Sequence, residues 1–171
     1  MKKLWAPWRE KYIKRGNKQK ENDRFLFTRL YRDKKKDKSN FIFARSQHAF
    51  AVLNIFPYNN GHVLIVPNRN VKDLDELEEK EREDLFYLLG DVKACLQETL
   101  KPQGFNIGIN IGKAAGAGIP EHLHIHVVPR WLGDSNFMPV IGGTKVISQS
   151  LNRLYILLKD AYEKRIRRAR K

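Results

Sequence analysis

The sequence predicts an α+β fold, with a five-stranded antiparallel sheet and two main helices. Short runs of β-branched and aromatic residues are separated by turn signals, which is typical of strands. Two longer segments carry apolar residues at helical spacing. Strands and helices do not alternate strictly, and this order favours an α+β domain. At 171 residues, the chain has the length of one compact domain.

The first three strands are predicted at Phe41–Phe43, Ala49–Leu53 and His62–Val66. They follow a Lys-rich run, Arg32–Lys38, which we expect to form a loop. The clearest turn signal is Pro57–Gly61, between the second and third strands. Consecutive strands joined in this way favour antiparallel pairing.

The first long helix is predicted over Asp73–Leu100, where apolar residues recur near helical spacing until a proline and a glycine end the run. Carboxylates crowd its first half, where the helix dipole favours negative charge. Two strands follow at Phe105–Ile111 and His122–Trp131. A second helix is predicted over Lys145–Arg168. One face of that helix carries Leu151, Leu154, Leu158, Tyr162 and Ile166.

The composition argues against a membrane span and a disulfide framework. No apolar run approaches the ~20 residues that a membrane span needs. The one cysteine, Cys95, cannot form an internal disulfide or a multi-cysteine metal site. The segment Met1–Trp8 is basic but lacks the apolar stretch of a secretory signal. We therefore expect a cytoplasmic protein that does not engage a membrane.

The net charge of +14 suits a polyanionic partner, either a nucleotide or a nucleic acid. Basic residues gather at both ends of the chain, and such runs are equally typical of a solvated surface. We expect a basic N-terminal segment at 1–40 that packs on the core, a central domain at 41–140 and a basic C-terminal helix at 141–171.

The chemistry-bearing feature is the alternating run of His122, His124 and His126 in the fifth predicted strand. Residues two apart in a strand share a face, so the three imidazoles project together while their apolar neighbours face the core. Mutual repulsion and partial burial keep most of them neutral near pH 7. Neutral imidazole is a nucleophile, a proton carrier or a metal ligand. A catalytic zinc needs a third ligand and supporting carboxylates, and Glu121 points to the other face, so a nucleophile is favoured over a metal site.

A small-residue loop, Gly112–Gly118, lies directly upstream of the histidines. Its backbone N–H groups could form a cradle for phosphate oxygens, or the loop could be an ordinary turn. It lacks the Gly-Lys-Ser/Thr ending of a P-loop. A nucleophile beside an anion cradle suggests attack on phosphorus.

The segments His122–Val128 and Asn54–Pro67 resemble the histidine triad (HIT) family, and the resemblance runs from about Phe41 to Trp131. The flanks Leu4–Arg9 and Pro129–Phe137 resemble the branch that contains bacterial diadenosine tetraphosphate (Ap4A) phosphorylases. The resemblance implies an antiparallel sheet, commonly paired into a homodimer through a continuous sheet. It also implies an enzyme that cleaves phosphoanhydride bonds of adenine-containing dinucleoside polyphosphates and requires no cofactor.

The resemblance also assigns roles to residues. His124 attacks the α-phosphorus to give a nucleotidyl-histidine, which water (in a hydrolase) or phosphate (in a phosphorylase) resolves. His126 binds the phosphate and assists proton transfer, and His122 orients the strand. The nucleotide-binding positions are His62, Asn54 at the ribose, and Asn110, Gly116, Ala117 and Gly118 at the phosphate. Independently of the resemblance, we place Trp131 at the site edge, where its ring could stack on the adenine; the alternative is that it packs on a neighbouring subunit.

Three departures from the family pattern are present. Many relatives carry a Gln near Gly118 that this chain lacks, which leaves the leaving-group contact open. Relatives often hold a structural zinc with two Cys and a His, at positions that correspond here to Phe25, Thr28 and Asn70. None is a good zinc ligand, so we predict no zinc and expect Phe25 to fill the space. The basic C-terminal helix lies outside the family core and could clamp a long polyphosphate, cover the sheet or only aid solubility.

Three alternative functions stay open. The first is hydrolysis of nucleoside phosphoramidates or acyl-nucleotides through the same intermediate. The second is a non-catalytic module that binds nucleotides or nucleic acid, for which steep salt dependence of binding would be expected. Nucleic acid is possible but not the favoured partner. A metal-dependent hydrolase is the least favoured.

Overall fold

A computed structural model of the chain describes residues 25–134 and 149–169. The first half contains α3 (Leu26–Arg32), the 3-10 turn η1 (Lys34–Lys36), and the strands β1 (Ile42–Arg45), β2 (Ala49–Leu53) and β3 (Val63–Pro67). The second half contains α4 (Glu79–Leu100), β4 (Gly104–Ile109), β5 (Ile125–Arg130) and α6 (Leu151–Ala169). The N-terminal segment Leu4–Arg9, which contributes to the family resemblance, lies outside the described residues.

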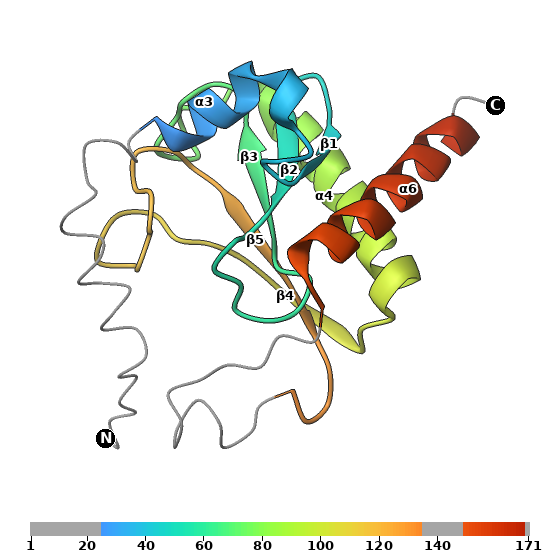
Figure 1. Ribbon diagram of the computed structural model, residues 1–171. Helices are drawn as coiled ribbons and strands as arrows, with labels where there is room; N and C mark the ends of the chain where they lie inside the picture. Colours follow the sequence, from blue (N-terminus) through green and yellow to red (C-terminus); the bar gives the residue numbers. More distant parts are fainter. Residues whose placement is uncertain (1–24, 135–148, 170–171) are drawn as a thin grey trace, which may run out of the picture.

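The five strands form one antiparallel sheet in the order β1-β2-β3-β5-β4 (Figure 1), which confirms the predicted fold class. β2 and β3 are buried along their whole length. Their side chains alternate between two core clusters, since Phe50 and Val52 belong to one cluster and Ala51 and Leu53 to the other. A sheet covered on both faces explains why these strands read as unbroken apolar runs.

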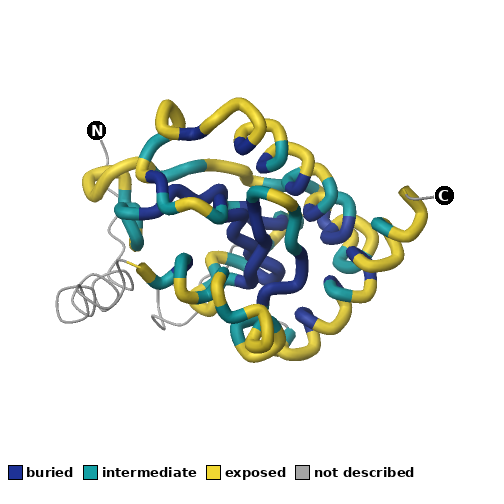
Figure 2. The backbone as a smooth tube through the Cα atoms, turned by 90° about the horizontal axis from the view of Figure 1, so that it is seen from above, coloured by how far each residue is buried: buried dark blue, intermediate teal, exposed yellow. Residues whose placement is uncertain are grey.

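The two long helices cover one face of the sheet (Figure 1), where they form the larger core cluster with the strands. α3 covers the other face, and its Phe27 packs with β1, β2 and β3 side chains in the smaller cluster. Figure 2 shows the buried backbone gathered in the central strands, with exposed positions along the outer sides of the helices. The two faces of the sheet therefore have different partners.

The helix α4 begins at Glu79 rather than at the predicted Asp73. A capping box sets this start: the side chain of Glu78 accepts from the backbone of Glu81, and Glu81 reaches back to the N–H of Glu78 at 2.9 Å. Arg69 holds the Glu81 carboxylate at 2.6 Å. Satisfying the first free N–H groups of a helix in this way fixes where it can begin.

The helix α6 packs on α4 and β1, with Leu154, Leu158 and Tyr162 buried. The predicted helix start at Lys145 lies outside the described residues. Three roles were considered for this segment. The structure supports the one in which the helix covers the sheet, because α6 lies on the face opposite α3. No helix within residues 25–134 and 149–169 has the length and apolar character needed to cross a membrane.

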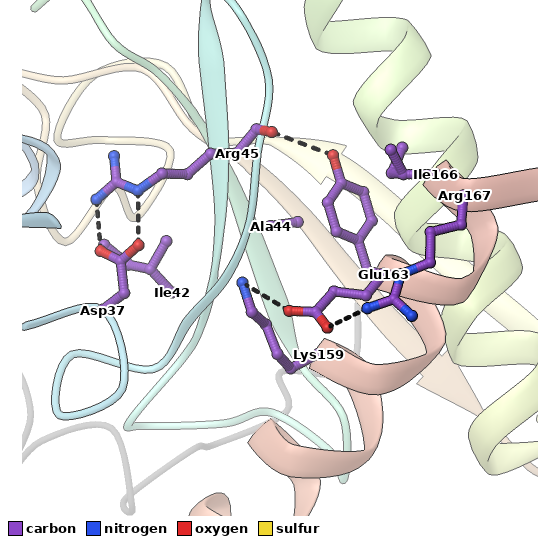
Figure 3. A pocket seen from close by; sticks show the side chains of 9 residues that line it. Asp37, Ile42, Ala44, Arg45, Lys159, Glu163, Ile166 and Arg167 are labelled. Carbon is purple, nitrogen blue, oxygen red and sulfur yellow. Dashed lines mark hydrogen bonds and ion pairs between the residues drawn. The ribbon is translucent and has the colours of Figure 1, made fainter. Parts of the chain in front are cut away.

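A pocket of about 290 Å³ lies between β1 and α6 (Figure 3). Its charged side chains already pair with one another: Arg45 with Asp37 at 2.6 Å, and Lys159 and Arg167 with Glu163 at 3.6 and 3.9 Å. None of the predicted site residues lines it. We therefore do not assign the chemistry of the chain to this pocket.

Candidate active site

The histidine run lies at and before the start of β5. The strand begins at Ile125, so His122 and His124 precede it, and the prediction of a strand from His122 was wrong. Pairing between β3 and β5 ends at Ile65 and Ile125, and the N–H of Leu123 turns instead to the carbonyl of Val71 at 2.7 Å. The alternation nevertheless continues through this extended segment.

The three imidazoles share one side of the chain, as predicted. Leu123, Ile125 and Val127 enter the larger core cluster. On the other side, His124 and His126 have ring centroids 4.9 Å apart. Phe27 from α3 lies 5.5 Å from His122 and 5.3 Å from His124, also between ring centroids. The helix α3 thus closes one end of the histidine cluster.

The nitrogen that can attack a substrate is Nε2 of His124. Nδ1 of His124 lies 2.8 Å from the carbonyl oxygen of His122. A carbonyl oxygen only accepts, so Nδ1 carries the proton and Nε2 keeps its lone pair. Burial lowers the pKa of His124, which holds the ring neutral near pH 7. A neutral imidazole with a free Nε2 is a competent nucleophile.

A chain of hydrogen bonds determines which ring nitrogen of His126 carries the proton. The N–H of Tyr58 donates to Nδ1 of His62 at 3.0 Å, so the neutral His62 ring carries its proton on Nε2. That nitrogen lies 2.9 Å from Nδ1 of His126 and donates to it. The proton of neutral His126 is therefore on Nε2. Nδ2 of Asn110, a second N–H donor, lies 3.5 Å from that nitrogen, so two donors stand side by side here. His126 can thus offer an N–H to an oxygen of a ligand.

Burial governs the charge of the whole cluster. It lowers the pKa values of His122 and His124, and it lowers the pKa of His126 to about 4, with a smaller contribution from His124. The expectation that most of these rings are neutral near pH 7 agrees with these directions.

The side chain of Asn54 is already engaged. Its Oδ1 accepts from the N–H of Phe56 at 2.9 Å, and its Nδ2 lies 3.3 Å from Nδ1 of His62. Asn54 therefore supports His62 directly, while the ribose contact stays a prediction. Asn110 follows β4 and reaches His126, so the structure brings His62, Asn110 and the triad together.

His122 is held by neutral partners. Its Nε2 donates to the carbonyl of Pro67 at 2.9 Å, and Nδ2 of Asn70 lies 3.3 Å from its Nδ1. The aromatic ring that packs on His122 is Phe27, whereas Phe25 is 51% exposed, so the expectation that Phe25 fills this space was wrong. The reason is that α3 turns the side chain of Phe27, and not that of Phe25, onto the sheet.

The loop with Gly116, Ala117 and Gly118 is a series of turns, in which the N–H of Gly116 donates to the carbonyl of Lys113 at 3.0 Å. Ile119 packs on the smaller core cluster, so the loop leads into the histidine face. The backbone carbonyl of Ile119 accepts a hydrogen bond from the N–H of His122 at 3.3 Å.

Trp131 lies at the other end of β5, five residues beyond His126. At ~3.3 Å a residue, this places its backbone roughly 16 Å from that of His126 along the strand. The structure therefore does not bring Trp131 to the histidines within one chain. Two residues that sequence reasoning missed are Phe27 and Tyr58, whose ring stacks on His126 with centroids 5.5 Å apart. Tyr58 lies in a segment that signals only a turn, and no local pattern marks Phe27.

Comparisons with known proteins found matches in sequence and in fold. The family model described as HIT domain matches residues 35–131. A protein named AP-4-A phosphorylase from Mycobacterium tuberculosis (strain ATCC 25618 / H37Rv) is 38% identical over 156 residues, covering 88% of this chain and 79% of the relative. An asymmetrical bis(5'-nucleosyl)-tetraphosphatase from Schizosaccharomyces pombe is 36% identical over 93 residues, covering 54% of this chain and 50% of the relative. The crystal structure of a Zn-bound histidine triad family protein from Mycobacterium smegmatis matches the fold with a TM-score of 0.66 at 24% identity, covering 82% and 94% of the two chains.

Proposed function

The chain belongs to the HIT domain family, and from that premise we propose that it cleaves dinucleoside polyphosphates through a nucleotidyl-histidine on His124. The observation that carries the proposal is the free Nε2 of His124, held by the hydrogen bond from Nδ1 to the carbonyl of His122 at 2.8 Å. Relatives named as a phosphorylase and a tetraphosphatase of such substrates support this substrate class.

In the first step, Nε2 of His124 donates its lone pair to the α-phosphorus, and the bond from phosphorus to the bridging oxygen breaks. The leaving polyphosphate takes the electron pair of that bond. The positive charge left on the His124 ring is stabilised because its Nδ1–H already donates to the carbonyl of His122. His126 donates its Nε2–H to an oxygen of the reacting phosphate, and Asn110 and the Gly116–Gly118 turn supply further donors.

In the second step, an oxygen of inorganic phosphate attacks the same phosphorus, or a water molecule does so and releases a proton to the solvent. The bond from phosphorus to Nε2 breaks, and His124 leaves as a neutral imidazole. Splitting the displacement into two through a covalent intermediate is ordinary nucleophilic catalysis. The similarity to a phosphorylase over 88% of the chain favours phosphate as the acceptor.

The test is a product analysis with Ap4A, with and without inorganic phosphate. A phosphorylase forms ADP and ATP only when phosphate is present, whereas a hydrolase forms AMP and ATP in its absence. A parallel assay on an adenosine phosphoramidate distinguishes the alternative substrate class. No turnover of any of these nucleotides would refute the proposed function.

We propose that no structural zinc is held at His122, although the Mycobacterium smegmatis protein of similar fold is described as Zn-bound. The donors do not fit a zinc ion: His122 uses Nε2 on the carbonyl of Pro67 and faces Asn70 with Nδ1. Within residues 25–134 and 149–169, no three His, Cys, Asp or Glu side chains gather as a metal site. Elemental analysis of purified protein should find no stoichiometric zinc, and a chelator should change neither activity nor melting temperature.

We further propose that two copies pair through β4. This strand ends the sheet order (Figure 1), so an outer row of backbone N–H and C=O groups faces away from β5. Ile107 on this strand is 46% exposed, and Phe105 is partly buried. Ile107→Lys should give a monomer in analytical ultracentrifugation. Ile156→Lys, which places the same charge at an exposed position of α6, should keep the dimer; a monomeric parent would refute the pairing.

A further inference from the structure

A carboxylate beyond the end of β5 ties down the loop that follows β2. Asp134 accepts from Nδ2 of Asn59 at 2.7 Å and from the N–H of Trp131 at 3.1 Å. Nε and Nη2 of Arg130 donate to the two oxygens of Asp134, at 2.7 and 2.8 Å. The amide of Asn59 also reaches the carbonyl of Pro129 at 3.1 Å. We call Asn59, Arg130, Trp131 and Asp134 the Asp134 clasp.

The Asp134 carboxylate in this clasp stays negatively charged near neutral pH. The guanidinium of Arg130 holds the pKa of the Asp134 carboxyl far below its usual range, and the Asp134 side chain is only 10% exposed. Bidentate hydrogen bonds between Arg and a carboxylate add geometric specificity as well as energy. Asn59, and with it the neighbouring Tyr58, is therefore fixed relative to β5.

Tyr58 contacts both histidines of the proton chain. Its ring stacks on that of His126, with centroids 5.5 Å apart and an interplanar angle of 11°. The same ring lies 4.5 Å from the ring of His62, and the backbone N–H of Tyr58 donates to Nδ1 of His62 at 3.0 Å. One residue thus covers one ring and fixes the proton position on the other.

We propose that Tyr58, held by the Asp134 clasp, is a positioning residue that keeps His126 neutral and presenting its Nε2–H. This inference rests on the proposed function, in which His126 donates to the reacting phosphate. Tyr58 acts through His62 and His126, so the role needs no contact between Tyr58 and the nucleotide.

The ring of His126 lies among side chains from several segments of the chain. His124 faces it from the same segment, His62 from the residue before β3, and Tyr58 from the loop after β2, while the uncharged Asn110 follows β4. Removing the Tyr58 ring would admit water to the face of His126. Rehydration stabilises the charged form of an imidazole, so the pKa of His126 would rise from about 4 toward its ordinary value.

The test compares Tyr58→Ala with Tyr58→Phe, which keeps the stacked ring, and with Asn59→Ala, which opens the clasp without removing a contact to either histidine. Leu132→Ala is the matched control, because Leu132 lies in the turn between Arg130 and Asp134 and is 86% exposed. Two readouts are needed: NMR titration of the His126 ring in the free protein, and kcat and KM for Ap4A as a function of pH.

We expect Tyr58→Ala to raise the midpoint of the His126 titration by roughly one pH unit or more. It should also lower kcat about tenfold with little change in KM, because the Nε2–H of His126 is no longer held in position for the reacting phosphate. Asn59→Ala should shift both quantities in the same direction, Tyr58→Phe should restore the values of the parent, and Leu132→Ala should match the parent.

A His126 midpoint that stays at the value of the parent in both Tyr58→Ala and Asn59→Ala would overturn the proposal, whatever happens to kcat. Equal loss in Tyr58→Ala and Tyr58→Phe would overturn it too, since the ring would then not be the cause. If the parent turns over no nucleotide, the proposed function fails, and the NMR titration still decides the role of Tyr58.

Discussion

At the residue scale, backbone groups decide what the imidazoles can do. The carbonyl of His122 holds the proton of His124 on Nδ1, and the N–H of Tyr58 keeps Nδ1 of His62 free of a proton. Because these partners belong to the main chain, side-chain changes nearby leave the tautomers in place unless they move the chain. In the proposed reaction, these contacts leave Nε2 of His124 without a proton for attack and Nε2 of His126 with a proton for donation.

His124→Ala should lower turnover of Ap4A by at least about a thousandfold, because the change removes the proposed nucleophile while the fold is retained. His48→Ala, in the turn between β1 and β2, is the control and should keep the activity of the parent. The measurement is kcat together with a circular dichroism spectrum of each variant. Activity of His124→Ala within tenfold of the parent would remove His124 from its role.

At the element scale, the start of α4 depends on a buried carboxylate. Glu81 is 5% exposed, and hydrogen bonds from Arg69, with the backbone of Glu78, hold its pKa below the ordinary value. Glu81→Gln should lower the free energy of unfolding by about 1–2 kcal/mol at neutral pH, since Arg69 is partly exposed and can rehydrate.

The stabilisation from Glu81 is present above the ordinary pKa of a Glu and is lost as pH falls through the lowered, folded-state value. The difference between Glu81→Gln and the parent in urea unfolding should therefore shrink in acid. Glu79→Gln, an exposed change in the same turn, serves as the control. A constant difference at all pH values would contradict the assignment.

The turn before His62 requires glycine at position 61. Gly61 has φ +77°, and a Cβ there would lie 2.5 Å from Cδ1 of Leu100 and 3.1 Å from Cγ of Pro129. Gly61→Ala should cost about 1–3 kcal/mol in unfolding free energy and should displace His62, lowering kcat. Gly90→Ala, at an open helical position, should instead stabilise by about 0.5–1 kcal/mol. Equal melting temperatures for the two variants would contradict this account.

The strands could be predicted to within three residues at each end, since apolar spacing reports burial directly, whereas α4 begins six residues after its predicted start. The residues at which β5 and α4 begin could not be predicted. β5 starts at Ile125 because pairing with β3 stops there, and α4 starts at Glu79 because its cap is made by Glu78 and Glu81. Both limits depend on contacts that spacing alone does not encode.

The shared face of the histidines follows from alternation, and it could be predicted from the sequence. The residues from other segments that pack against that face could not be predicted. Phe27 reaches the cluster from a short helix in a basic segment, and Tyr58 reaches it through a loop whose signals indicate only a turn. Such contacts join positions far apart in the sequence, so no local pattern marks them.

At the scale of the whole molecule, the sheet separates two tasks. The long helices α4 and α6 build the larger core on one face, and the histidines occupy the other face beneath α3. The basic helix α6 is thereby directed away from the candidate site of its own chain. Burial of the histidine cluster also links the stability of the whole fold to pH.

The free energy of unfolding should decrease as the pH is lowered from about 7.5 to about 5. The folded-state pKa values of His122, His124 and His126 are lowered, so in this window the unfolded chain binds more protons than the folded one. Each pKa unit corresponds to about 1.4 kcal/mol, and partial exposure of His126 reduces its share. We expect the free energy of unfolding in urea to decrease over this window, and His126, with a folded-state pKa of about 4, contributes up to roughly 2 kcal/mol of the decrease.

The matched variant for this prediction is His126→Asn, which removes one of the three titrating groups. Its unfolding free energy should depend less steeply on pH than that of the parent. A flat dependence in the parent across the window would show that the cluster titrates as it does in the unfolded chain.

The most direct test of the central claim is to trap the covalent intermediate. The protein is mixed with Ap4A in the absence of phosphate, quenched in alkali within the first turnover, digested and analysed by mass spectrometry. We predict one adenylyl group on the peptide that contains His124, absent in His124→Ala and lost from the parent when phosphate is added before the quench. Turnover of Ap4A with no adenylyl group on that peptide, or with the group on another residue, would contradict the account.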